Sequence, residues 1–155
     1  MATIEEVIFQ ASATIFGGAL IYAIVNLINI FILKPYSNFK NEVIKTKIDL
    51  LFYKNILTNA FEREETNDKF IEEILSCQKK IREQWSKLSV KYHAVPKLLF
   101  SWKLPSIEDM HKIEENLIYL SNRFILKSQN RDLPNDCAES ENKVRFILNK
   151  LSKTA

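Results

Sequence analysis

The residues best suited to chemistry, two cysteines and two histidines, are spaced unfavourably for it. Cys77 and His93 lie 16 residues apart in one predicted helix, a separation of roughly 24 Å along its axis. A nucleophilic thiolate needs a base within hydrogen-bonding reach, and Cys137, though it could sit at a helix N-terminus, has no assigned base. His111 lies beside acidic residues with no His-Glu-x-x-His or paired-cysteine spacing nearby, so no metal site is predicted.

The carboxylates also fail to form a predicted catalytic pair. Glu72/Glu73, Glu108/Asp109 and Glu114/Glu115 are sequence neighbours, and neighbouring helical residues point about 100° apart rather than into one cavity. The only glycines are Gly17 and Gly18, which excludes a glycine-rich phosphate loop further along the chain. We therefore expect no enzymatic activity, no cofactor and no small-molecule substrate.

The element that dominates the sequence is an uncharged apolar run from Val7 to Leu33. As a helix this run would extend about 40 Å, against a hydrocarbon core of about 30 Å. A cleaved signal peptide is the main alternative, but its first residues should be basic and its apolar core about half as long. The sequence therefore predicts residues 1–34 as an N-terminal segment with one transmembrane helix.

The charges on either side of this helix predict its orientation. Glu5 and Glu6 precede it, whereas Lys34, Lys40, Lys45 and Lys47 follow it closely. Positively charged flanks stay in the cytoplasm, so we expect a single-pass protein of the inner membrane with its N-terminus outside. The four lysines could contact anionic lipid headgroups. Residues 34–155 carry 22 basic and 17 acidic side chains of alternating sign, so nucleic acid is not an expected partner.

One face of the predicted span carries polar and small residues. Projected at 100° per residue, this set falls within about 120°, and its members are Gln10, Thr14, Gly17, Gly18 and Asn29. Phe9, Phe16 and Phe31 fall on the opposite side. Small residues let helices approach closely, and amides in hydrocarbon seek partners. We expect the span to associate with another helix through this face. The alternative is a plain anchor, in which the small residues have no role and occur only because glycine and alanine are common in spans.

The remaining residues, 35–155, predict a cytoplasmic helical domain. Its expected helices run over about 37–61, 67–94, 106–124 and from 135 or 136 onward, which together predict an all-α, four-helix bundle-like fold. In the second of these, apolar spacing predicts a buried seam at Ile71, Ile74, Gln78, Ile81, Trp85, Leu88 and Tyr92. The expected core comprises Ile74, Ile81, Trp85, Leu88, Leu117, Leu120 and Phe124.

Two connections carry further expectations. Pro35 predicts a break or kink just after the span, because proline disfavours helix at the preceding residue. The apolar connector Lys97–Leu104 could fold back onto the bundle or dip into the bilayer, and the first arrangement is favoured. Phe100 and Trp102 are its aromatic residues.

Four short segments, taken in their order along the chain, are similar to segments of known proteins. They read Phe52-Tyr-Lys-Asn-Ile-Leu-Thr-Asn59, Ile81-Arg-Glu-Gln-Trp-Ser-Lys-Leu88, Pro105-Ser-Ile-Glu-Asp109 and Asn116-Leu-Ile-Tyr-Leu-Ser-Asn122. This order resembles a loose group of small uncharacterised bacterial proteins with one N-terminal span and a cytoplasmic helical domain. The chain departs from that group at Trp85, Tyr119 and Arg123, where small residues are commoner. The resemblance implies this architecture and carries no activity.

Together these features favour a membrane-anchored interaction or scaffold protein that self-associates or binds another membrane protein. The alternative is an oligomerising membrane-active effector, whose spans assemble to permeabilise the membrane when triggered. An effector also needs a sensor, and no nucleotide-binding signature is present.

Overall fold

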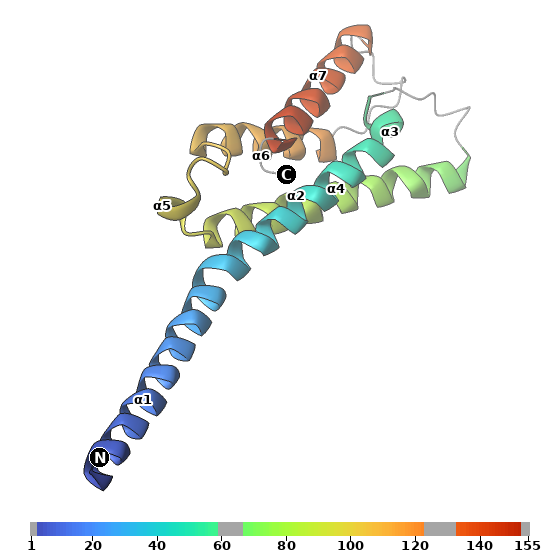
Figure 1. Ribbon diagram of the computed structural model, residues 1–155. Helices are drawn as coiled ribbons and strands as arrows, with labels where there is room; N and C mark the ends of the chain where they lie inside the picture. The colour runs from blue at the N-terminus through green and yellow to red at the C-terminus, as the bar shows by residue number, and fades with distance from the viewer. Residues whose placement is uncertain (1–2, 59–66, 123–132, 153–155) are drawn as a thin grey trace.

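The computed structural model describes residues 3–58, 67–122 and 133–152, and its regular elements are all helices. The expected all-α class is therefore confirmed for this part of the chain. In order, the elements are α1 (Ile4–Ile28), the π-helical turn η1 (Asn29–Leu33), α2 (Lys34–Phe52), α3 (Lys54–Thr58), α4 (Asp68–Ala94), α5 (Lys97–Phe100), α6 (Ile107–Asn122) and α7 (Leu133–Ser152). Figure 1 shows α1 projecting away from the other helices.

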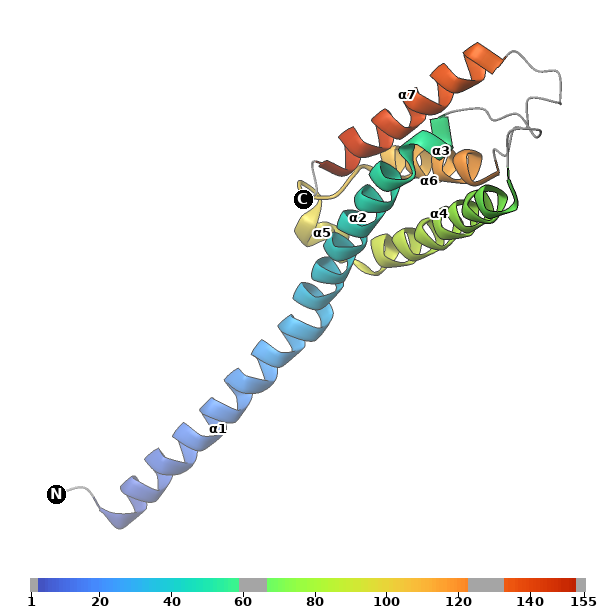
Figure 2. The same cartoon turned by 90° about the vertical axis from the view of Figure 1, so that its right-hand side faces the viewer.

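The first three elements form one continuous helix, Ile4–Phe52, of 49 residues (Figure 2). It begins with a capping box, in which the Glu6 backbone N–H donates to Thr3 Oγ1 and the Thr3 N–H donates to Glu6 Oε2. These two bonds satisfy donors that a helix start leaves free, and they place a carboxylate at the positive end of the helix dipole.

Of the break or kink predicted at Pro35, the break is wrong, because the chain crosses this proline without leaving the helix. The π-helical turn η1 comes just before it, and there the Lys34 N–H donates to the Asn29 carbonyl, five residues back. Pro35 then lies in the first turn of α2. Because the helix does not start here, its tolerance of Pro35, which has no N–H to donate, follows from the change to hydrogen bonds five residues back in η1 just before it.

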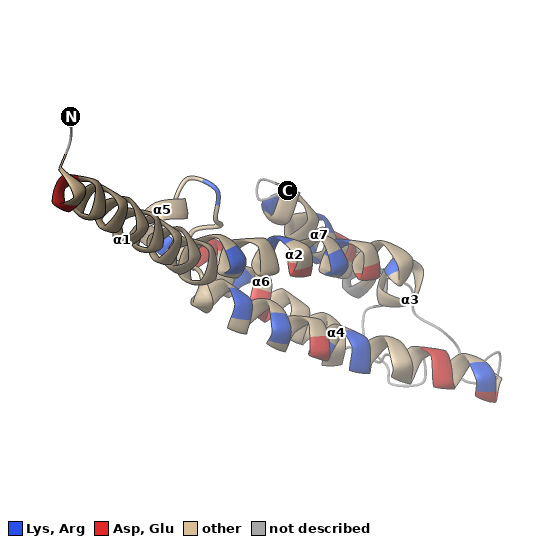
Figure 3. Ribbon diagram, turned by 60° about the horizontal axis from the view of Figure 1, so that its bottom comes forward, with Lys and Arg blue, Asp and Glu red and all other residues tan. Residues whose placement is uncertain are grey.

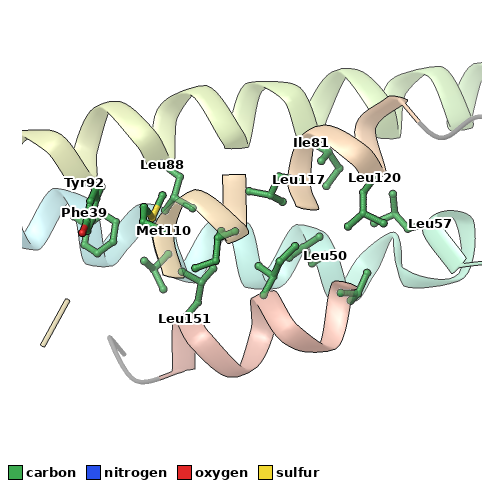
Figure 4. Close-up of a cluster of buried hydrophobic side chains, with 14 of the residues drawn as sticks. Phe39, Leu50, Leu57, Ile81, Leu88, Tyr92, Met110, Leu117, Leu120 and Leu151 are labelled. Carbon is green, nitrogen blue, oxygen red and sulfur yellow. The ribbon is translucent and has the colours of Figure 1, made fainter. Parts of the chain in front are cut away.

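Helices α2 to α7, residues 34–152, are called the helical domain below. Contacts run from α2 to α4, from α4 to α6, from α6 to α7 and from α7 back to α2, so these four helices surround one apolar core (Figure 4). Predicted core residues Ile74, Ile81, Leu88, Leu117 and Leu120 are buried. Trp85 is only partly buried against the core, and Phe124 lies outside the described residues.

The seam predicted along α4 from Ile71 to Tyr92 is wrong at Ile71, Gln78 and Trp85, which are only partly buried, and correct at its other four positions. The buried residues of α4 are Ile74, Cys77, Ile81, Gln84, Leu88 and Tyr92. Gln78 and Trp85 are each displaced by one residue from this line, which turns them about 100° toward the edge of the contact. The seam therefore carries an amide, Gln84, where an indole had been expected.

Helix boundaries differ from the expectation at two other places. The helix predicted to run to about residue 61 turns at Tyr53 and continues as the short helix α3. The helix α7 begins at Leu133 rather than at a cap on Asn135 or Asp136, because Pro134 fits a first helical turn. The predicted start near Ser106 is confirmed, since Ser106 Oγ accepts from the Asp109 N–H at 3.0 Å.

Candidate functional site

Helix α1 has no buried residue, and all of its residues except Ser12 and Gly17 are exposed. The most apolar 18-residue stretch of the long helix has a mean hydropathy of 2.2 and none of it is buried inside the structure. Glu5 and Glu6 lie in the first turn of α1, and no charged residue follows them before Lys34. Figure 3 shows the ribbon of α1 as tan beyond this first turn. The core helix of a soluble protein would be covered, whereas this one is long and apolar enough to cross a membrane and is covered by nothing in the described chain.

The polar face of α1 is not used within the described chain. Because Ile4–Ile28 is regular α-helix, Gln10, Thr14, Gly17 and Gly18 do share one stripe. The Thr14 hydroxyl donates to the Gln10 carbonyl at 2.8 Å, so its hydrogen-bonding need is met locally. A Cβ added at either glycine would meet nothing within 4 Å. The Gln10 and Asn29 side chains are exposed, so association through this face stays a prediction.

The four lysines after α1 are spread along a straight helix. Lys34 and Lys47 are separated by about 20 Å along the axis of α2, at 1.5 Å per residue. Lys45 is also drawn toward Glu42 Oε2, 3.9 Å from its Nζ. Headgroups occupy only about 5–7 Å on each side of the hydrocarbon core. With α2 upright on a membrane, Lys34 is therefore the best placed of the four to contact lipid, and Lys40 is next.

A second structural feature lies where α1 passes into α2. The ring of Tyr36 stacks on that of Phe100 from α5, with centroids 4.3 Å apart and planes 3° from parallel. Of the apolar connector, Phe100 and Leu104 pack against the core, whereas Leu98 and Trp102 are exposed. The favoured arrangement, folding back onto the bundle, is therefore found for Phe100 and Leu104.

Buried polar side chains join α2 to α4, and sequence patterns did not reveal them. Gln84 Nε2 donates to Asp49 Oδ2 at 2.6 Å. The Thr46 hydroxyl lies 3.5 Å from Gln84 Oε1, a long contact across the two helices. Its shorter bond, at 2.9 Å, is to the Glu42 carbonyl on its own helix. Gln84 is 3% exposed and Thr46 0%. A helical spacing from Ile81 to Gln84 to Leu88 was the only local signal. These contacts fix α4 in register along the helix that continues from α1.

Cys77 lies in an environment unsuited to nucleophilic chemistry, and the two histidines are exposed. Burial, helped by the charges of Glu73 and Asp49, raises the pKa of the Cys77 thiol to about 12, so it stays protonated near neutral pH. His93 is exposed with its ring against Tyr92, and His111 Nδ1 lies 3.7 Å from Glu114 Oε2. Within the three described ranges, no three His, Cys, Asp or Glu side chains converge as metal ligands would.

Comparison of the chain with protein-family models, curated proteins and solved structures finds no match to any of them. The distinctive features of the described chain are therefore the exposed apolar helix, the junction at Tyr36 and the polar contacts between α2 and α4.

Proposed function

We propose that this protein is a membrane-anchored, non-enzymatic interaction protein whose α1 crosses the membrane once. Helices α2, α4, α6 and α7 would act as a four-helix bundle that presents its surface to a partner in the cytoplasm. The N-terminus would lie outside, because Glu5 and Glu6 stand at one end of the apolar helix and Lys34 at the other. Membrane lipid is one partner, and a second copy or another membrane protein is the other.

The observation that carries this proposal is the exposure of α1 beside a well-formed core. Side chains such as Phe9, Phe16, Leu20 and Phe31 are each more than 60% exposed. Left in water, a side chain of this kind forgoes about 1.5–3 kcal/mol of burial free energy, and α1 carries many of them. Lipid is the solvent that removes this penalty while leaving every backbone bond inside the helix.

Self-association is proposed from the Gln10, Gly17 and Gly18 face of α1. An amide in hydrocarbon without a partner is unfavourable, and the two glycines leave open space into which a second helix can fit. The same observation favours the second candidate, an oligomerising membrane-active effector. The two differ in cells, because a scaffold can be expressed without harm whereas an effector arrests growth once it is triggered.

Membrane anchoring is tested by flotation of membranes from expressing cells after an alkaline wash. The full chain should float with the lipid. Leu20→Lys adds about 2.5–3.5 kcal/mol to insertion, because Leu20 lies at the centre of the span. Combined with Leu27→Lys, which costs less because Leu27 lies nearer the end of the span, this change should lower the floating fraction. Release of the unaltered chain by the wash would contradict an integral span.

Self-association is tested by crosslinking the full chain in membranes and by its mass in a mild detergent. Gly17→Leu with Gly18→Leu should block close approach and lower the crosslinked fraction. The matched control, Phe9→Leu with Phe16→Leu, changes the opposite face and should leave it unchanged. Asn29→Leu should have a smaller effect than the glycine pair, since one interhelical hydrogen bond contributes only about 0.6–2 kcal/mol. Equal results from both pairs would reduce α1 to a plain anchor.

A further inference from the structure

The connector between α4 and α6 exposes an apolar patch, called the α5 patch here and made of Leu98, Leu99 and Trp102. Leu98 is 92% exposed, Trp102 75% and Leu99 43%. Contiguous exposed apolar side chains mark an interaction site more often than scattered ones do. Lysines flank the patch on both sides, at Lys97 and Lys103.

Several contacts hold the backbone beneath the patch in place. Phe100 stacks on Tyr36 of α2, and the Tyr92 hydroxyl donates to the Pro105 carbonyl at 3.0 Å. Lys97 Nζ lies 4.7 Å from the centre of the Tyr92 ring, a cation–π contact. Because the connector is fixed to both α2 and α4, its exposed side chains keep a defined position on the domain.

That position is level with the end of the apolar helix. Tyr36 lies three residues beyond Leu33, which is about 4.5 Å along the helix axis, and the polar layer of each leaflet is about 5–7 Å thick. Both Figure 1 and Figure 2 place α5 beside the start of α2, at the end of the helical domain nearest α1. Leu98 and Trp102, each two residues from Phe100, are therefore within reach of the headgroup layer.

We propose that the α5 patch is a second membrane contact, inserted into the headgroup and upper acyl region of the leaflet from which α1 emerges. Indole rings favour this layer, because one part of the ring is apolar and its N–H can meet water or a headgroup. Lys103, whose Nζ lies 6.0 Å from the centre of the Tyr36 ring, would face anionic headgroups. The inference rests on the proposed membrane anchor, since only that anchor brings the patch to the surface.

This second contact would fix how the helical domain sits on the membrane. The patch lies to one side of the α2 axis, so its insertion prevents rotation of the domain about the span. It also presents the same face of the domain to the cytoplasm in every copy.

The experiment places the full chain in vesicles of phosphatidylcholine and phosphatidylglycerol whose acyl chains are brominated near the headgroup. The two tryptophans are read separately: Trp85→Phe leaves Trp102 as the reporter, and Trp102→Phe leaves Trp85. Trp102 emission should shift to shorter wavelength and be quenched several-fold more than that of Trp85, which packs against the core. Leu98→Glu should lower this quenching, whereas Val90→Glu, exposed on α4, should not.

Flotation of the same vesicles separates the possible failures. A chain that does not float overturns the proposed anchor and this inference together. A floating chain whose Trp102 is unquenched by lipid and open to acrylamide in water overturns the α5 contact alone. If Trp102 is shielded from acrylamide but not quenched by lipid, and the shielding grows with protein density, a second copy covers the patch and the lipid contact is wrong.

Discussion

Replacing Gln84 by methionine tests how the helix that continues from α1 is joined to α4. Methionine is close to glutamine in length, so the change removes the amide without leaving a large cavity. What is lost is the 2.6 Å bond from Gln84 Nε2 to Asp49 Oδ2 and a long contact with the Thr46 hydroxyl. The Thr46 hydroxyl keeps its bond to the Glu42 carbonyl, so the Asp49 contact should account for most of the effect.

The expected magnitude follows from the partial exposure of Asp49. A hydrogen bond to a charged group contributes about 1.5–3 kcal/mol, but Asp49 is half-buried and can regain water when the amide is removed. Gln84→Met should therefore lower the free energy of unfolding by about 1–2 kcal/mol. In a double-mutant cycle with Asp49→Ala, the coupling free energy should be about 1 kcal/mol or more.

The assay is denaturant unfolding of the full chain in a mild detergent, monitored by the circular dichroism of its helices. Gln78→Met is the matched control, because Gln78 is on the same helix but at the edge of the contact, and it should change stability by less than about 0.5 kcal/mol. A coupling free energy near zero for Gln84 and Asp49 would refute the reasoning. The register of α4 on α2 would then be set by apolar packing alone.

Three further predictions concern single side chains. In intact cells an impermeant maleimide should label Ile4→Cys but not Cys137, and labelling of Cys137 would reverse the proposed orientation; Cys77 is buried and cannot serve as this reporter. Trp85→Ala should lower the free energy of unfolding by about 3 kcal/mol, the low end for a core tryptophan because the ring is partly exposed, and an unchanged melting temperature would assign Trp85 to binding. The Cys77 pKa is raised from 9.0 to about 12, so between these two values the unfolded chain loses the thiol proton while the folded chain keeps it. The free energy of unfolding should therefore fall by on the order of 1 kcal/mol by pH 10, and Cys77→Ala should lessen that fall in alkaline unfolding curves.

The long apolar helix and most of the core were predictable because both depend on local composition and spacing. The helix expected over 67–94 is found at Asp68–Ala94. Within it, Ile74, Ile81 and Leu88 are buried as expected, since apolar residues at steps of three and four must share a face.

The exchange of Gln84 for Trp85 in the seam was not predictable from α4 alone. Two adjacent residues both continue the spacing from Ile81 to Leu88, and hydrophobicity favours the indole. Gln84 rather than Trp85 is buried in the seam because it donates to Asp49, a hydrogen-bond partner on α2 that no local pattern reveals. The continuous helix through Pro35 was missed for a related reason, because the penalty for proline applies to α-helix and a π-helical turn precedes it here.

The α5 patch shows the same division between local and distant information. The composition of the connector Lys97–Leu104 was visible in the sequence, but which of its side chains pack on the core and which form the α5 patch was not. That choice depends on the stacking of Phe100 on Tyr36, two residues that no sequence spacing connects.

The unbroken helix Ile4–Phe52 makes α2 a lever arm attached to α1. The 19 residues of α2 extend about 28 Å at 1.5 Å per residue. A change of about 10° in the tilt of the span would therefore move the far end of α2 sideways by about 5 Å, the height of one helical turn. With no loop to absorb this motion, it would be delivered to α4 through Gln84 and Asp49. If α1 crosses a membrane as proposed, a change in bilayer thickness or the arrival of a second span would in this way displace α4 inside the helical domain.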